Sequence, residues 1–257
     1  LEFGQEKPAV VTGVAIAPGG DSLAAAGDDH IVRIWRLNDG RLLNQLKGHD
    51  DWVRTVQYSP DGQLLASGGN DREIRVWSAS NGQLIKSLNK HEHVITNLAF
   101  DPSGKSIVSV GFERNLRVYS CPDGILTGEM ACPCVDMRAV AISLDGLRMA
   151  AAGRNGKIRL WDRATGETIH EIESARQRIY ALAFSPDGRH LASGSEGRHV
   201  RIWNAETGEE ELTLPIKTAK IMSLAFAGPN RLATGGSDNR VLLWDLKTGT
   251  VTHQLLG

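Results

Sequence analysis

The sequence predicts an all-β chain made of six tandem copies of one four-stranded antiparallel module. A short motif, which in the second copy reads Ile74-Arg75-Val76-Trp77, recurs along the chain. Its closing aromatic residue falls at Trp35, Trp77, Tyr119, Trp161, Trp203 and Trp244, so successive copies are 42 residues apart, except for the last at 41. Turn residues divide each copy into four short segments. Segments of this length between tight turns form an antiparallel meander.

The second copy shows most clearly why each segment becomes a strand. We expect strands at 53–58, at 64–67, in the segment that ends at Trp77, and at 83–88. The segments between them are Ser59-Pro60-Asp61-Gly62, Gly68-Gly69-Asn70-Asp71 and Asn81-Gly82. In such segments proline presets φ, while glycine and asparagine accept positive φ, so each is expected to be a turn.

The other copies follow the second with local departures. We expect modules at 9–47, 50–89, 93–131, 135–173, 178–215 and 220–257, after a leader, 1–8, that is either a cloning remnant or the end of a preceding outer strand. The third copy closes on Tyr119 in place of tryptophan, and the fourth uses Ser143-Leu144-Asp145-Gly146 as its first turn. The sixth copy loses one residue near Pro229, which explains the spacing of 41.

Gly48-His49 early in the copy and a closing tryptophan late in it, at a period of about 40–45 residues, are the features by which the whole chain resembles the WD-repeat β-propeller family. The resemblance implies a β-propeller of four-stranded antiparallel blades, with six blades encoded here. The second strand has small or apolar residues on both faces, as at 22–26, 64–67 and 191–193, and neighbouring blades on either side would require this. Propellers of this family have seven blades more often than six. We therefore expect part of a seven-bladed or larger propeller, or else a ring closed by lateral contacts alone.

Composition and charge narrow the classes of function. Hydrophobic residues make up 41% and charged residues 23% of the chain, which is ordinary for a globular protein. The formal net charge of −1 predicts no bulk attraction to nucleic acid or to an anionic membrane. No apolar run approaches the roughly 20 residues of a membrane helix, and the start of the chain does not resemble a signal peptide. An arginine precedes five of the six closing aromatics by two residues, at Arg33, Arg75, Arg117, Arg159 and Arg201. These arginines are spread around the repeats and cannot form one nucleic-acid groove.

The chain has three cysteines, Cys121, Cys132 and Cys134. This number fits a reducing compartment better than a disulfide framework, so we expect a cytoplasmic protein. Cys132-Pro133-Cys134 invites a metal interpretation, but a structural zinc site needs four ligands, and no histidine is close by in sequence. We expect a loop with incidental free thiols and no metal site, the alternative being a surface redox role.

By the resemblance, His49, Ser67, Asp71 and Trp77 occupy the positions of the family's structural tetrad. An indole N–H needs a buried acceptor, and a serine hydroxyl accepts it while donating onward to histidine. A satisfied buried network of this kind fixes the packing of a blade. The same residue types make up the triad of a serine hydrolase, but a nucleophile must be exposed at a pocket, and these positions are expected to be internal. The sequence also has no Gly-x-Ser-x-Gly elbow.

The resemblance places the usual binding surface on the face formed by the turns between second and third strands and by the starts of the first strands. Carried over by alignment, the candidate residues are Trp52, Arg54, Asn70, Phe112, Arg138, Arg154, Arg178, Tyr180 and Glu196. Aromatic and arginine side chains are enriched at interaction hot spots. Arginine binds carboxylates and phosphates bidentately, so we expect a protein or peptide partner with acidic or phosphorylated groups. The alternative is that these side chains only pack between blades.

These observations predict a non-enzymatic scaffold for protein–protein interaction, with no cofactor. The first alternative is a sensor or regulatory propeller within a larger signalling protein, such as an ATPase or a kinase. A hydrolase and a nucleic-acid binder are the remaining alternatives. We rank them last because the sequence offers no cofactor loop, no metal-ligand spacing, no exposed nucleophile and no basic domain.

Overall fold

The computed structural model describes residues 9–88, 91–174, 176–216 and 219–256, and the expected leader at 1–8 lies outside them. The described chain is all-β, with six four-stranded antiparallel sheets that are the blades of a β-propeller, as the sequence predicts. The blades are numbered 1 to 6 in chain order. The chain divides into two compact units: unit 1 is Leu1–Leu98 with Pro122–Gly124, and unit 2 is Ala99–Cys121 with Ile125–Gly257.

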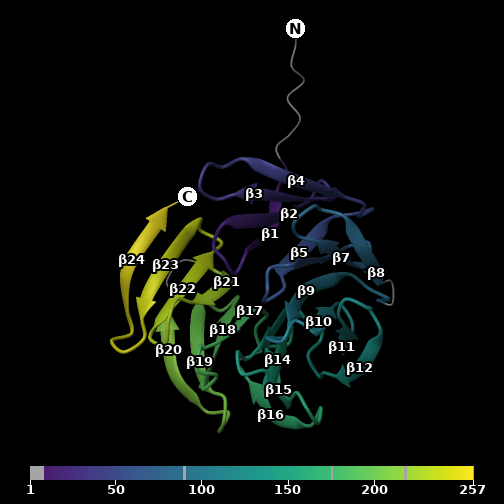
Figure 1. The fold of residues 1–257 in the computed structure, drawn as a ribbon. Coiled ribbons are helices and arrows are strands. Elements are labelled where there is room, and N and C mark those ends of the chain that lie inside the picture. Colours follow the sequence, from purple (N-terminus) through teal and green to yellow (C-terminus); the bar gives the residue numbers. More distant parts are fainter. Residues whose placement is uncertain (1–8, 89–90, 175, 217–218, 257) are drawn as a thin grey trace. The chain divides into compact units, whose positions relative to one another are not determined.

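Unit 1 contains blades 1 and 2, and in each sheet the strands lie side by side in chain order (Figure 1). Blade 1 consists of β1 (Val11–Ile16), β2 (Ser22–Gly27), β3 (Ile31–Arg36) and β4 (Leu42–Lys47). Blade 2 consists of β5 (Val53–Tyr58), β6 (Leu64–Gly69), β7 (Ile74–Ser78) and β8 (Leu84–Leu88).

Unit 2 contains blades 4 to 6 and most of blade 3, since the boundary between the units falls inside β9. Blade 3 consists of β9 (Ile95–Phe100), β10 (Ser106–Gly111), β11 (Asn115–Ser120) and β12 (Leu126–Ala131). Blade 4 consists of β13 (Ala139–Ile142), β14 (Arg148–Ala152), β15 (Lys157–Asp162) and β16 (Thr168–Glu173). Blade 5 consists of β17 (Ile179–Phe184), β18 (His190–Ser195), β19 (His199–Asn204) and β20 (Glu210–Pro215). Blade 6 consists of β21 (Ile221–Phe226), β22 (Arg231–Gly236), β23 (Arg240–Asp245) and β24 (Thr250–Leu256).

Blade 2 differs from expectation in one turn. Gly68 and Gly69 were expected to begin the turn after the second strand, but both belong to β6, and Gly69 pairs with Val53 across the sheet. The turn begins at Asn70. Glycine is needed at position 69 for a close approach, because an added Cβ would lie 2.0 Å from the carbonyl oxygen of Trp52.

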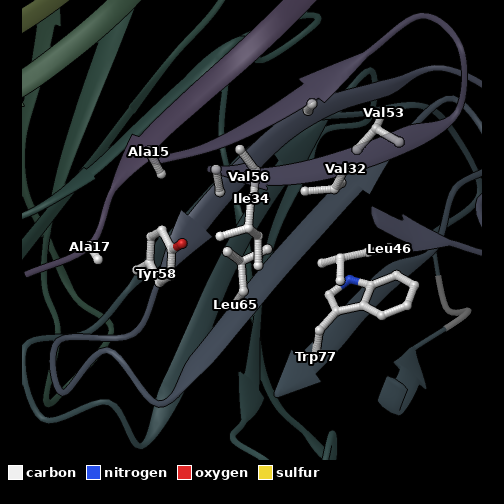
Figure 2. Packing of buried hydrophobic residues seen from close by; sticks show 12 residues of the cluster. Ala15, Ala17, Val32, Ile34, Leu46, Val53, Val56, Tyr58, Leu65 and Trp77 are labelled. Carbon is white, nitrogen blue, oxygen red and sulfur yellow. The ribbon is translucent and has the colours of Figure 1, made fainter. Parts of the chain in front are cut away.

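The core of unit 1 lies between its two blades, where β1, β2 and β3 contact β5 (Figure 2). Ile34 of blade 1 and Val56, Leu65 and Trp77 of blade 2 belong to one apolar cluster and are almost fully buried. Ala24 of β2 belongs to it too, and its small side chain lets the facing strand pack closely. Burial of small residues on both faces of the second strand therefore follows from blade-to-blade packing.

The expectation of free thiols at Cys132 and Cys134 is wrong, because a disulfide bond joins the two residues. A spacing of one residue brings their Cα atoms to 4.9 Å, within the range that disulfides span. Both side chains are buried, so the loop that carries them is part of the packing and not an incidental surface segment. Cys121 is not part of this disulfide bond.

Candidate functional site

In blade 2 the structure brings His49, Ser67, Asp71 and Trp77 together in one buried network. His49 lies in the linker before β5, Ser67 in β6, Asp71 in the following turn and Trp77 in β7. Trp77 Nε1 donates to Ser67 Oγ at 2.8 Å, and His49 Nε2 lies 2.7 Å from the same oxygen. His49 Nδ1 lies 2.6 Å from Asp71 Oδ2. The network therefore links the linker, two strands and a turn of one blade.

This network has the residue types of a hydrolase triad but not its accessibility. The Ser67 residue and the His49 side chain are both 0% exposed. Because Ser67 accepts from the Trp77 indole, its own hydrogen is available to His49 Nε2, which leaves Nδ1–H to donate to Asp71. A nucleophile has to reach a substrate carbonyl, and Ser67 reaches only its neighbours in the blade.

Acid should weaken this network through Asp71. Burial raises the pKa of the Asp71 carboxyl. The hydrogen bond from His49, the charge of its imidazole when protonated and two backbone N–H groups more than offset this, so the pKa lies below its usual value. A carboxyl with a depressed pKa stabilises the fold above its unfolded pKa of about 3.9, and this contribution is lost as the pH falls through the folded value. We expect the difference in free energy of unfolding between wild type and Asp71→Asn, measured in urea, to shrink below about pH 4. A difference that persists unchanged down to about pH 2 would contradict this assignment.

The other blades keep parts of the network. Trp203 Nε1 donates to Ser193 Oγ at 2.9 Å in blade 5, and Trp244 Nε1 donates to Thr234 Oγ1 at 3.1 Å in blade 6. In blade 3 the aromatic position is Tyr119, whose burial raises the pKa of its hydroxyl to about 12. The network is thus retained unevenly among the blades. This is typical of a structural element that stabilises each blade separately, because apolar packing can replace the network in a blade that lacks it.

Three predicted face residues lie together in unit 1. Trp52 is 44% exposed, and the guanidinium carbon of Arg54 lies 6.0 Å from the centroid of its ring, at the limit of a cation–π contact. Arg54 Nε donates to Asn70 Oδ1. The backbone N–H of Trp52 donates to Asp51 Oδ1 at 2.6 Å. Trp52 thus presents a large aromatic surface on a fixed backbone, beside an oriented arginine.

In unit 2 four predicted residues form an alternating row of rings and guanidinium groups, termed here the arginine–aromatic row: Phe112, Arg138, Tyr180 and Arg178. The guanidinium carbon of Arg138 lies 4.9 Å from the Phe112 ring centroid and 5.8 Å from that of Tyr180. That of Arg178 lies 5.9 Å from the Tyr180 centroid, and Arg178 Nη1 donates to the Tyr180 hydroxyl at 3.3 Å. The row draws on the β10–β11 turn and the starts of β13 and β17.

Two ion pairs flank the row. Arg154 Nη1 lies 3.3 Å from Asp136 Oδ2, and Lys220 Nζ lies 2.7 Å from Glu196 Oε1. The hydrogen bond from Lys220, opposed in part by desolvation and assisted by the charges of Lys220, Arg178 and Arg138, lowers the pKa of Glu196. The carboxylate therefore sits in a positive potential.

Asp136 and Lys220 were not among the candidate residues. A sequence signal for them exists, because both occupy the entry position of the first strand that Trp52 and Arg178 occupy in their own blades. Arginine and aromatic types were favoured as hot spots, and that preference left out the partner carboxylate and the lysine.

Within the described ranges, no group of three or more histidine, cysteine, aspartate or glutamate side chains is placed to hold a metal ion. Nor does this part of the chain contain a helix long and apolar enough to cross a bilayer.

Comparison with protein families finds six matches to the family described as WD domain, G-beta repeat. The matched segments are residues 2–36, 40–78, 82–120, 125–162, 166–204 and 208–245. Each segment ends one residue past a closing aromatic, as at Trp35 and Trp77. A comparison with curated proteins found no match. Because the six matches cover nearly the whole chain, the protein belongs to the WD40 repeat family.

Proposed function

We propose that this protein is a scaffold that binds protein or peptide segments bearing acidic or phosphorylated groups, through the arginine–aromatic row. WD40 propellers commonly serve as protein-interaction scaffolds and are generally non-catalytic. The observation that carries the proposal is the position of the Arg138 guanidinium between the rings of Phe112 and Tyr180, at 4.9 and 5.8 Å from their centroids.

Stacking between two rings fixes the plane of a guanidinium group. Its N–H donors lie in that plane, in a fork that matches the two oxygens of a carboxylate or phosphate. An arginine held in this way loses less conformational entropy on binding than a free one, which favours affinity. The charges of the row and its flanking ion pairs also favour an anionic ligand. Positive charges outnumber negative ones there, with Arg138, Arg178, Arg154 and Lys220 on one side and the carboxylates of Asp136 and Glu196 on the other.

Replacing Arg138 with glutamate should abolish most of this binding. The probe is a fluorescein-labelled peptide with a phosphoserine followed by glutamates, titrated with the full chain by fluorescence anisotropy. A central hot-spot residue contributes at least about 2 kcal/mol, so we expect the Kd to rise at least about 30-fold. Arg138→Lys keeps the charge but loses the planar fork, and its Kd should lie between those of the wild type and Arg138→Glu.

The matched control is Arg189→Glu, which makes the same change of charge at an exposed position in the β17–β18 turn of blade 5. It should leave the Kd unchanged. A neutral peptide of the same composition, with serine and glutamine in place of the acidic groups, should bind far more weakly. Equal affinity of Arg138→Glu and wild type for the phosphopeptide, with both proteins folded by circular dichroism, would remove the row as the binding site.

A further inference from the structure

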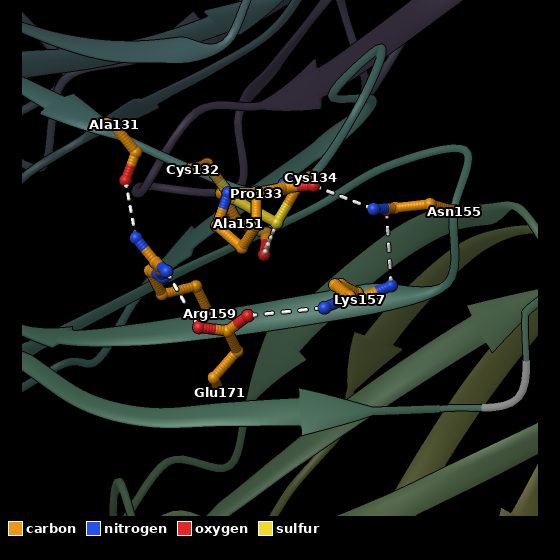
Figure 3. The surroundings of a disulfide bond; sticks show 9 residues. All are labelled: Ala131, Cys132, Pro133, Cys134, Ala151, Asn155, Lys157, Arg159 and Glu171. Atoms are coloured by element: carbon orange, nitrogen blue, oxygen red, sulfur yellow. Dashed lines mark hydrogen bonds and ion pairs between the residues drawn. A yellow bond between two sulfur atoms is a disulfide. The ribbon is translucent and has the colours of Figure 1, made fainter.

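The linker between β12 and β13 of unit 2 carries the disulfide bond of Cys132 and Cys134 (Figure 3). The two residues are 3% and 0% exposed, and they belong to an apolar cluster that includes Leu116, Val140 and Trp161. The backbone N–H of Cys134 donates to Cys132 Sγ at 3.3 Å. The bond is therefore part of the packing at the point where the chain enters blade 4.

The disulfide stands where blade 2 has its histidine network. In blade 2 the linker is anchored by His49, bonded to Ser67 and Asp71. In blade 4 the histidine position is Pro133, and the position of the acid is Asn155, whose Nδ2 donates to Pro133 O at 2.7 Å (Figure 3). At the position where blade 2 uses its histidine, blade 4 thus has an amide hydrogen bond and a covalent bond that reduction can open.

The linker leads directly into the arginine–aromatic row. Beyond the disulfide, Arg154 N donates to Val135 O at 2.7 Å, and Arg138 N donates to Ala152 O at 2.9 Å. Asp136, which pairs with Arg154, has a φ of 49°, in the left-handed region that non-glycine residues rarely adopt. The backbone between the disulfide and Arg138 is therefore short. Its conformation is fixed by two backbone hydrogen bonds and by the left-handed turn at Asp136.

The linker also lies tightly against the end of β14. A Cβ added at Gly153 would lie 2.4 Å from Val135 O and 2.9 Å from Asp136 O, both of them backbone atoms. The linker has no room to move toward Gly153. We therefore expect a displacement at the disulfide to reach the four residues that follow it, which end at Arg138.

The bond contributes little as a staple of the fold. A disulfide stabilises chiefly by closing a loop in the unfolded chain, and the effect grows with the length of the loop. Here the two cysteines are only 2 residues apart in sequence, so the loop that the bond closes is very short and the stabilisation is small. The surrounding cluster also contains Val108, Met149 and other apolar side chains that are not part of the bond, and we expect their packing to persist when the bond opens. Opening the bond should therefore change the linker and leave the blade folded.

We propose that Cys132 and Cys134 are a reversible thiol–disulfide site, oxidised by low-molecular-weight disulfides, whose state sets the position of Arg138 in the arginine–aromatic row. The coupling to ligand rests on the function proposed above, whereas the redox chemistry does not. The disulfide form holds the linker fixed and the row arranged for an anion. The dithiol form releases the linker and weakens binding.

Oxidised glutathione is the oxidant of the appropriate class. Cys132 is 3% exposed, so the reaction requires a local opening of the linker that admits glutathione. The Cys132 thiolate then attacks one glutathione sulfur, so that a mixed disulfide forms and one glutathione thiolate leaves. The Cys134 thiolate then attacks Cys132 Sγ, closing the protein disulfide and releasing the second glutathione. Two cysteine thiols lose two protons and two electrons, and one oxidised glutathione gains them as two reduced glutathiones.

The redox site is tested by trapping. The full chain is equilibrated in buffers of graded ratios of oxidised to reduced glutathione, quenched in acid, unfolded and alkylated with N-ethylmaleimide. Of the three cysteines, we expect all to be alkylated at the reducing end and Cys121 alone at the oxidising end, with a graded transition between them. Cys121→Ser should leave this transition unchanged. A pair that stays fully oxidised or fully reduced in every buffer would overturn the proposal.

The coupling is tested by binding and by hydrogen exchange. We expect the phosphoserine peptide to bind the oxidised protein at least about fivefold more tightly than the reduced protein, the lower end of coupling between two sites. The variant Cys132→Ser/Cys134→Ser should bind equally in both buffers, at the affinity of the reduced wild type. Amide exchange across 135–138 should be slower in the oxidised wild type and independent of buffer in the variant.

The two proposals fail separately in these experiments. If the peptide binds neither form but exchange across 135–138 still follows the redox state, the proposed ligand is wrong and the redox site stands. If the peptide binds both forms with equal affinity, or if exchange is the same in both, the coupling of the disulfide to Arg138 is wrong and the binding function stands.

Discussion

Replacing Trp77 with alanine should lower the free energy of unfolding by about 3–5 kcal/mol, the usual effect of deleting a fully buried tryptophan. Trp77 is 2% exposed and packs in the apolar cluster between blades 1 and 2 of unit 1. Its loss leaves a cavity there. It also removes the indole that donates to Ser67 Oγ, so the buried hydroxyl loses one of its two partners. Urea unfolding followed by circular dichroism measures the change.

Trp77→Phe separates the hydrogen bond from the bulk of the ring. Phenylalanine keeps most of the apolar contact but cannot donate, so we expect a cost of about 1–2 kcal/mol, part of it from the smaller ring. The matched control is Trp161→Phe in blade 4, where the tryptophan is 1% exposed and Ala151, which has no hydroxyl, stands at the position of Ser67. The control should cost less. Equal costs for the two phenylalanine variants would show that the indole–serine hydrogen bond adds nothing to the stability of blade 2.

The strands and the hydrogen-bond network of blade 2 can be predicted from sequence because the residues that determine them lie close together in the chain. Ser67 and Trp77 are ten residues apart, on neighbouring strands of one hairpin, so the period alone aligns them. Val53–Tyr58 forms a strand with the expected bounds for the same reason, since its turn residues follow it directly. Where two glycines could be either a turn or a strand, sequence reasoning chose wrongly, because the deciding contact of Gly69 is with the backbone at Trp52.

Contacts between blades are harder to predict from the sequence than contacts within a blade. The repeat alignment brings Phe112, Arg138 and Tyr180 to one face as separate candidates, but their order as ring, guanidinium and ring depends on side-chain packing across three blades. The disulfide was missed for a different reason. A count of three cysteines argues against a framework of long loops, yet it says nothing about a bond between Cys132 and Cys134, which needs only local geometry.

The first turn of blade 3 carries a long-range interaction that the sequence does not indicate. Blade 2 has Ser59 at the buried start of this turn and Asp61 at its exposed tip, and blade 3 exchanges the two types, with Asp101 at the start and Ser103 after it. Asp101 is 1% exposed, and a buried carboxylate needs a countercharge. Arg163, 62 residues further on, supplies it from blade 4 with Nη2 at 2.7 Å from Asp101 Oδ2. No periodicity indicates that partner.

Arg163→Met should therefore destabilise the protein by about 3 kcal/mol, because it strands the Asp101 carboxylate away from water without a cation. The arginine side chain is 29% exposed, which places the effect at the lower end of the range for a broken buried pair. Its Nε also donates to Gly146 O at 2.9 Å, and that hydrogen bond contributes about 1 kcal/mol of the total.

The test is the same substitution in a background where the carboxylate has been moved. Asp101→Ser with Ser103→Asp recreates the Ser-Pro-Asp-Gly turn of blades 2 and 5, with its acid at the exposed tip. In that background Arg163→Met loses only the bond to Gly146 O, so its cost in urea unfolding should fall to about 1 kcal/mol. If the cost is the same in both backgrounds, Arg163 stabilises blade 4 without reference to Asp101. If the cost falls as expected, the main role of Arg163 is to neutralise the buried carboxylate of Asp101 in blade 3.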